Sequence, residues 1–115
     1  MKKEVVLMFA AAASWMLAIP GCSQEWEGKA TPELLKHGEE LFAQHCAGCH
    51  PDGENAFYSQ KTLHRIDLTA NGVTTPAGIV SIMRNPEKGM KQFDKTVISD
   101  NDAFTIAQYI LVTFK

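Results

Sequence analysis

Residues 46–50 of the chain are Cys46-Ala47-Gly48-Cys49-His50, and we expect the rest of the fold to be organised around this stretch. A predicted helix leads into it. Thr31-Pro32 supplies an N-cap followed by proline at the first helical position. Apolar residues then recur at steps of three and four up to Cys46, namely Leu34, Leu35, Leu41 and Phe42. The sequence therefore predicts an amphipathic helix that ends at two cysteines and a histidine.

The spacing of these three side chains has a chemical reason. Two thiols three positions apart reach two neighbouring vinyl groups on one edge of a porphyrin, and a histidine directly after the second cysteine places its imidazole under the iron. The pattern C-x-x-C-H is the motif of covalent c-type haem attachment. The sequence thus predicts one covalently bound haem c, held through Cys46 and Cys49, with His50 as an axial ligand of the iron.

Three other uses of the same residues explain the pattern less well. A thioredoxin-like C-x-x-C would lie in a βαβ context, which the sequence lacks. A zinc site needs four ligands, but His45, Cys46, Cys49 and His50 on one helix would form two pairs about 100° apart, which cannot surround a tetrahedral ion. A structural disulfide would leave His50 without a role.

The second axial ligand must come from elsewhere in the chain. The candidates are the remaining sulfur and imidazole donors: Met83, Met90, His37, His45 and His64. Met90 lies in Gly89-Met90-x-x-Phe93, a predicted loop that can present a side chain to the opposite haem face. Met83 falls among apolar helix residues, where core packing is the ordinary role. We expect Met90 to be the ligand, with His64 as the main alternative because bis-histidine ligation is common.

The middle of the chain is predicted to contain loops and one short helix. Residues 51–74 are polar and interrupted by glycine and proline, with one short helical turn expected near residues 61–66. Thr75-Pro76 repeats the N-cap and proline pattern, which predicts a helix over residues 77–84. Asn85-Pro86 ends it.

A last helix is predicted at the C-terminal end of the chain. Ser99 and Asp102 form an S-x-x-D capping pattern, and apolar residues continue at helical spacing through Phe114. No segment shows the alternation of a strand. The fold class predicted is all-α, with three main helices around one covalently bound haem.

The first 22 residues have the character of a targeting segment. Lys2 and Lys3 precede an apolar run that ends at Pro20-Gly21, and this run is short for a membrane span, which needs about 20 apolar residues. Ile19-Pro20-Gly21-Cys22 is similar to the lipobox of bacterial lipoproteins. We therefore expect a signal peptide over residues 1–21, lipid attached to Cys22, a tether over residues 22–31 and a haem domain over residues 32–115. A plain secretory signal is the alternative.

Charge and cysteine content restrict the class of partner. The formal net charge is −2, so the chain has no basic excess for neutralising phosphates and nucleic acid is not an expected partner. The acidity predicts a weak preference for a positive patch on any protein partner. The three cysteines are all used if Cys22 carries lipid and the other two carry haem, which leaves no thiol free to react in an oxidising compartment.

Over residues 32–115 the chain resembles the short class I cytochromes c of bacteria. The resemblance depends on Gly38-x-x-Leu41-Phe42-x-x-x-Cys46-Ala47-Gly48-Cys49-His50, Pro76 to Pro86, Gly89-Met90-x-x-Phe93 and Ala107-x-Tyr109-Ile110. It implies that the first and last helices cross closely, with Gly38 and Phe42 against Ile106, Tyr109 and Ile110. Lys91 departs from the family, which usually has proline directly after the ligand methionine.

The resemblance implies a function in electron transfer. Iron ligated by His50 and Met90 has no free coordination position, so the expected activity is single-electron transfer by a monomeric carrier rather than an enzyme. The expected location is the periplasmic side of a bacterial membrane, lipid-anchored or soluble, with redox proteins as donors and acceptors. The alternatives are a haem enzyme or sensor with an open sixth site and a fixed electron-entry subunit of a larger complex. Arg84 and Asn85 are candidates for hydrogen bonds to a haem propionate or to a loop.

Overall fold

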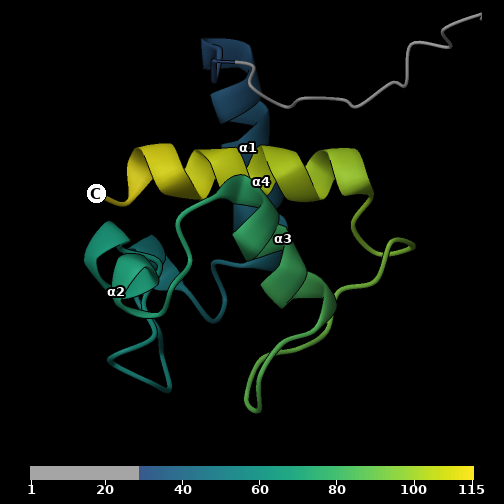
Figure 1. The fold of residues 1–115 in the computed structure, drawn as a ribbon. Coiled ribbons are helices and arrows are strands. Elements are labelled where there is room, and N and C mark those ends of the chain that lie inside the picture. The colour runs from purple at the N-terminus through teal and green to yellow at the C-terminus, as the bar shows by residue number, and fades with distance from the viewer. Residues whose placement is uncertain (1–28) are drawn as a thin grey trace, which may run out of the picture.

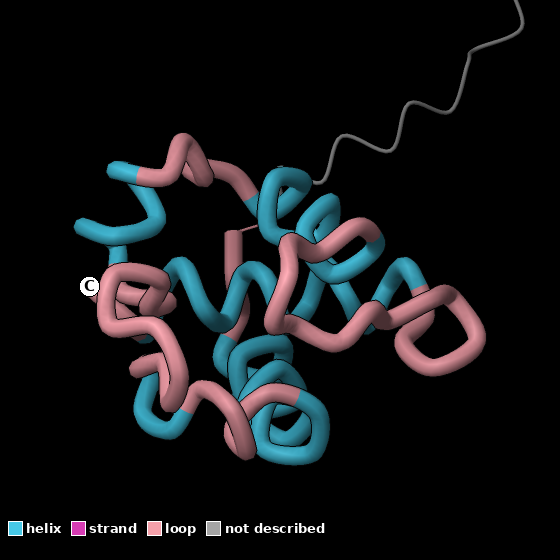
Figure 2. The backbone as a smooth tube through the Cα atoms, turned by 90° about the horizontal axis from the view of Figure 1, so that it is seen from below, coloured by secondary structure: helices cyan, strands magenta, loops and turns pink. Residues whose placement is uncertain are grey.

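The computed structural model describes residues 29–115, which form a helical domain (Figure 1). Its helical elements are α1 (Pro32–His45), the short 3-10 helix η1 (Pro51–Gly53), α2 (Arg65–Ala70), α3 (Pro76–Arg84) and α4 (Asp100–Thr113). Within residues 29–115 there is no strand, and Figure 2 shows loops joining the helices. The prediction of an all-α domain with three main helices is confirmed. The predicted signal peptide, Cys22 and most of the tether lie outside the described residues.

The three long helices begin where their caps predict. Thr31 Oγ1 accepts a hydrogen bond from the backbone N–H of Leu34 at 3.2 Å, and Thr75 Oγ1 accepts one from Gly78 at 3.1 Å. Ser99 Oγ accepts one from the backbone N–H of Asp102 at 3.1 Å. Each bond satisfies an N–H that has no partner inside its own helix.

Helices α1 and α4 cross at a close contact (Figure 1). A Cβ atom added to Gly38 would lie 2.6 Å from Tyr109 Cβ and 3.0 Å from the backbone oxygen of Thr105. The ring of Phe42 lies 5.5 Å from that of Tyr109 and 5.3 Å from that of Phe114, measured between centroids. The crossing implied by the resemblance is confirmed, and only glycine allows the two backbones to approach this closely.

The segment between the motif and α3 differs from its prediction. The helical turn expected near residues 61–66 is wrong, because the helix in this region begins at Arg65 and continues to Ala70. Thr62 explains the later start: its hydroxyl donates to Asp67 at 2.5 Å and accepts the N–H of His64 at 3.2 Å, which holds residues 62–64 in a turn before the helix. The helix η1 also lies within the predicted loop.

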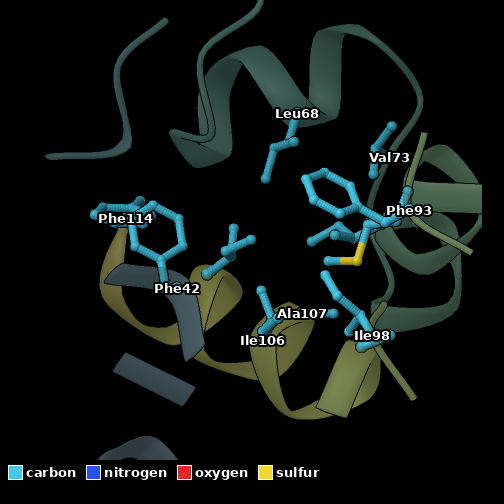
Figure 3. Close-up of a cluster of buried hydrophobic side chains, with 12 residues drawn as sticks. Phe42, Leu68, Val73, Phe93, Ile98, Ile106, Ala107 and Phe114 are labelled. Carbon is cyan, nitrogen blue, oxygen red and sulfur yellow. The ribbon is translucent and has the colours of Figure 1, made fainter. Parts of the chain in front are cut away.

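The core lies between α4, α3 and the loops that flank them (Figure 3). Ile98, Ile106 and Ile110 are its largest fully buried side chains. Leu68 of α2 and Met83 of α3 are also buried in this cluster. Among the described residues no helix has both the length and the apolarity needed to cross a membrane.

Candidate functional site

The domain contains a cavity of about 270 Å³ beside its core. The end of α1, the residues that follow it, α3 and the loop before α4 all contribute to the wall. Cys46, Cys49 and His50 line it together with Met83, Met90 and Phe93. Most of the remaining wall is apolar and includes Leu63, Leu68, Val73, Ile79, Ile98 and Ile110. The fold thus brings the motif and the Met90 loop to one cavity.

The backbone at the end of α1 positions the motif. The amides of Cys46 and Ala47 both donate to the carbonyl oxygen of Phe42, at 2.8 and 2.9 Å. The chain then turns, and the amides of Cys49 and His50 donate to the carbonyl oxygen of Cys46 at 3.1 and 2.9 Å. These bonds bring Cys46, Cys49 and His50 to the cavity from one compact turn.

Both cysteines of the motif are thiols in this structure, so the disulfide alternative is not formed. Burial, with a smaller contribution from Cys49, raises the pKa of the Cys46 thiol to about 11. The thiol is therefore neutral at ordinary pH and lies in an apolar wall. A neutral, partly buried sulfur fits a thioether to an apolar porphyrin edge better than it fits a charged metal ligand.

The imidazole of His50 is held in one orientation. Its Nδ1 lies 2.9 Å from the backbone carbonyl oxygen of Glu54. Because a carbonyl oxygen only accepts, Nδ1 is the donor and carries the proton. Nε2 of the neutral ring is then left with its lone pair, which is the tautomer that binds a metal.

The five candidates for the second axial ligand differ in their position. Met90, Met83 and His45 line the cavity, and Met83 is also 3% exposed and packed in the core. His64 is absent from the wall: its Nε2 lies 3.1 Å from Glu54 Oε1, and its ring contacts Phe114 edge-on. His37 pairs with Asp102 at 3.4 Å on α4, also outside the cavity wall.

The loop that carries Met90 is held against the end of α3. The backbone amide of Phe93 donates to the carbonyl oxygen of Met83 at 2.9 Å, and the side-chain Nε2 of Gln92 donates to the carbonyl oxygen of Arg84 at 2.8 Å. Arg84 donates to the carbonyl oxygen of Phe93 and to Asp100 Oδ1, each at 2.9 Å. Of the two roles predicted for Arg84, the structure places it in loop hydrogen bonds.

Asn85, the residue named with Arg84, does line the cavity. The carbonyl oxygen of Glu54, which orients His50, is a functional group that sequence reasoning missed. Because every residue has a backbone carbonyl, no side-chain pattern could have identified it.

The residues present fit a haem. The wall is apolar, two thiols lie at one end of α1, and an imidazole nitrogen with a free lone pair accompanies them. The zinc alternative finds no support, because the described part of the chain has no group of three or more His, Cys, Asp or Glu side chains that could hold a metal ion.

Comparison with known proteins identifies relatives of the same kind. The family described as "Cytochrome C oxidase, cbb3-type, subunit III" matches residues 33–110. Cytochrome c6 of Synechocystis sp. is 44% identical over 77 residues, which cover 67% of this chain and 63% of the relative. Cytochrome c6 of Cyanidium caldarium is 35% identical over 77 residues, which cover 67% of this chain and 69% of the relative.

A solved structure extends the similarity to three dimensions. OmcF, outer membrane cytochrome F from Geobacter sulfurreducens, superimposes with a TM-score of 0.66 at 44% sequence identity. The match covers 68% of this chain and 99% of OmcF. Sequence, fold and cavity agree: the chain belongs to the small monohaem class I cytochromes c, which carry one covalently bound haem c.

Proposed function

We propose that this protein is a single-electron carrier of the cell envelope, with haem c attached to Cys46 and Cys49 and the iron ligated by His50 and Met90. The observation that carries the proposal is one apolar cavity whose wall includes all four of these residues. The c6 relatives and OmcF support the same class of function.

Each of these residues has a separate task at the cavity. The bound haem iron supplies the chemistry, because it is oxidised and reduced by one electron. Cys46 and Cys49 fix the position of the group, and His50 offers Nε2 because Glu54 holds the proton on Nδ1. Met90 offers a thioether, which favours the reduced state and raises the potential relative to a second histidine. If His50 and Met90 both ligate the iron, the chain would leave no coordination position for a substrate.

The position of the other donors supports Met90 over His64. His64 would have to leave both Glu54 and Phe114 to approach the cavity. Met90 already lies in the cavity wall, and hydrogen bonds at Gln92 and Phe93 fix the loop that carries it. An enzyme or sensor would need an open sixth site, which this arrangement of the Met90 loop does not favour.

Substitution of each cavity methionine by leucine tests the ligand assignment. Met90→Leu should abolish the sulfur-to-iron charge-transfer band of the ferric protein and lower the reduction potential, while the haem stays attached. Met83→Leu is the matched control, because leucine replaces methionine in a core at a cost below about 1.5 kcal/mol. It should keep both the band and the potential. A Met90→Leu protein with an unchanged band and potential would reject Met90 as the ligand.

We also propose that the carrier is held at the periplasmic side of a membrane by lipid on Cys22. The sequence Ile19-Pro20-Gly21-Cys22 supports this location, and OmcF is described as an outer membrane cytochrome. A tether near the membrane would raise the effective concentration of the domain for redox proteins located there.

Cys22→Ser tests the anchor. The variant should move from the membrane fraction to the soluble periplasmic fraction while keeping the haem spectrum of the wild type. A variant that stays in the membrane fraction after a high-salt wash would contradict lipid attachment at Cys22.

A further inference from the structure

The carbonyl oxygen that orients His50 belongs to a tight turn just after the cysteine motif. Asp52 and Gly53 in this turn have positive φ angles of 51° and 81°. The amide of Gly53 donates to the carbonyl oxygen of His50 at 3.2 Å, and the amide of Glu54 donates to that of Pro51 at 2.9 Å. The direction of the Glu54 carbonyl, and with it the bond to His50 Nδ1, therefore depends on the conformation of this turn.

The ring of Phe114, the residue that follows α4, packs directly against the turn. A Cβ atom on Gly53 would lie 2.6 Å from Phe114 Cδ1 and 2.7 Å from Phe114 Cγ. The positive φ and this contact both favour glycine at position 53. Phe114 does not line the cavity, so it acts on His50 only through the residues that it contacts.

Phe114 also contacts a second residue that bonds Glu54. Its ring lies edge-on to that of His64, with 5.9 Å between centroids, and His64 Nε2 lies 3.1 Å from Glu54 Oε1. The side chain of Glu54 is 62% exposed, so this polar contact contributes little. Gly53 is buried, and its contact with Phe114 is therefore the main connection to the Glu54 carbonyl.

The ring of Phe114 is itself held in place. It is buried, and its centroid lies 5.3 Å from that of Phe42 and 5.9 Å from that of Tyr109. These distances are typical of favourable aromatic pairs, and Figure 3 shows Phe114 beside Phe42. The amide of Arg65 donates to the carbonyl oxygen of Phe114 at 3.1 Å. The ring thus links the turn to the crossing of α1 and α4.

We propose that Phe114 is a positioning residue for the axial histidine. Its ring supports the turn at Gly53, which keeps the carbonyl oxygen of Glu54 on His50 Nδ1. A ligand histidine that donates from Nδ1 is a more basic ligand, and hydrogen bonding of this kind helps to set the potential of a haem. The inference rests on the proposed ligation by His50 and adds a residue outside the cavity that controls it.

Phe114→Ala tests the role on two readouts. Loss of the ring should let the turn move and weaken the bond to His50 Nδ1, which makes the imidazole a poorer electron donor to the iron. The reduction potential of the holoprotein should therefore rise. The NMR signal of the Nδ1 proton in the ferrous protein should move upfield. Phe114→Leu, which keeps more of the apolar volume, should shift both readouts in the same direction by less. Unchanged readouts in both variants would overturn the proposal.

Ile106→Ala is the matched control for general loosening of the core. Ile106 is fully buried on α4, eight residues or about 12 Å before Phe114, and it does not line the cavity. The substitution should lower stability to a similar degree, because it also removes a large buried side chain. It should leave the potential and the Nδ1 signal unchanged. If Ile106→Ala moved both readouts as far as Phe114→Ala does, the positioning role would be wrong.

A double-variant cycle tests the path through Gly53. Gly53→Ala, Phe114→Leu and the combination of the two are compared by the position of the Nδ1 signal. Because the two residues are in contact, their effects on the signal should not add. Additive shifts would overturn the path. Glu54→Ala keeps the backbone carbonyl and removes the contact with His64, so the Nδ1 signal should stay in place. A shift as large as that of Phe114→Ala would assign the effect to His64 and overturn the path through Gly53.

The wild-type spectrum separates failure of this inference from failure of the proposed function. In a ferrous haem protein the porphyrin ring current shifts the ring protons of a ligand histidine strongly upfield. If His50 of the wild type lacks these shifts, it is not a ligand, and the proposed function fails together with the positioning role. If His50 has the shifts and the Phe114 variants change neither the potential nor the Nδ1 signal, only the positioning role fails.

Discussion

At Gly38 the absence of a side chain sets the distance between α1 and α4. The Cβ of any other residue would lie 2.6 Å from Tyr109 Cβ and 3.0 Å from the backbone oxygen of Thr105. The contact also fixes the α1 residues that follow, including Phe42 and the start of the cysteine motif. A single position on α1 therefore influences the shape of the haem cavity.

Gly38→Ala should destabilise the holoprotein by about 1–3 kcal/mol, the usual cost of adding a methyl group to a tightly packed contact. The free energy of unfolding is measured by guanidinium titration followed by circular dichroism. Gly78→Ala is the control: its Cβ would have only ordinary contacts of 3.4 Å or more. The control should leave stability unchanged or raise it by up to about 1 kcal/mol. Equal stability of the two variants would contradict the close crossing.

At this scale, the sequence predicted the roles of residues that belong to a characteristic side-chain pattern. The spacing of Cys46, Cys49 and His50 led to the cavity that all three line, and the resemblance to class I cytochromes c led to the helix crossing at Gly38. Glu54 acts on His50 through its backbone oxygen, and Tyr58 meets Gly89 through the fold of two loops. Neither contact leaves a pattern in the sequence, because each depends on where the backbone passes.

At the scale of elements, the capping residues predicted where helices begin better than the spacing of apolar residues did. Thr31, Thr75 and Ser99 each accept the hydrogen bond that their position implies, and the three long helices begin there. The short helix α2 was misplaced because Thr62 makes side-chain bonds to residues further along the chain. Such local competition between a turn and a helix is not visible in apolar spacing.

Contacts between elements also hold the Met90 loop between α3 and α4. Arg84 at the end of α3 bonds the loop at Phe93 and the first turn of α4 at Asp100. Hydrogen bonds from Lys95 and Arg84 hold the pKa of Asp100 below its ordinary value of 3.8. The folded protein therefore releases this proton more readily than the unfolded chain does. The stabilisation is complete above about pH 3.8 and is lost as pH falls through the lower folded value.

Asp100→Asn should reduce the loss of stability on acidification below pH 3.8. It should also loosen the loop at neutral pH, because Arg84 and Lys95 lose their charged acceptor. Urea titrations from pH 3 to 7 measure the first effect, and amide hydrogen exchange at Phe93 measures the second. Glu40→Gln, at an exposed α1 residue with no ion pair recorded within residues 29–115, is the control. An acid profile of Asp100→Asn identical to that of the wild type would contradict the role of the pair.

At the scale of the whole molecule, the haem completes a core that the chain leaves open. The buried cluster of aliphatic and aromatic side chains surrounds a cavity of about 270 Å³ instead of filling it. A small domain has little apolar surface to bury, so a large apolar group at its centre adds burial that side chains alone do not supply. The all-α class and the position of the motif were predictable from sequence. The ion pair between Lys61 and Glu87 was not predictable, because these two residues meet only in the folded chain.

The central claim is that Cys46 and Cys49 carry one haem through covalent bonds. Trypsin should release residues 37–61 as one peptide, because no lysine or arginine lies between Lys36 and Lys61. The purified holoprotein is denatured, treated with iodoacetamide, digested and analysed by mass spectrometry. We predict that this peptide carries the mass of one haem and that neither cysteine is alkylated. A haem-free peptide alkylated at both cysteines would contradict the account.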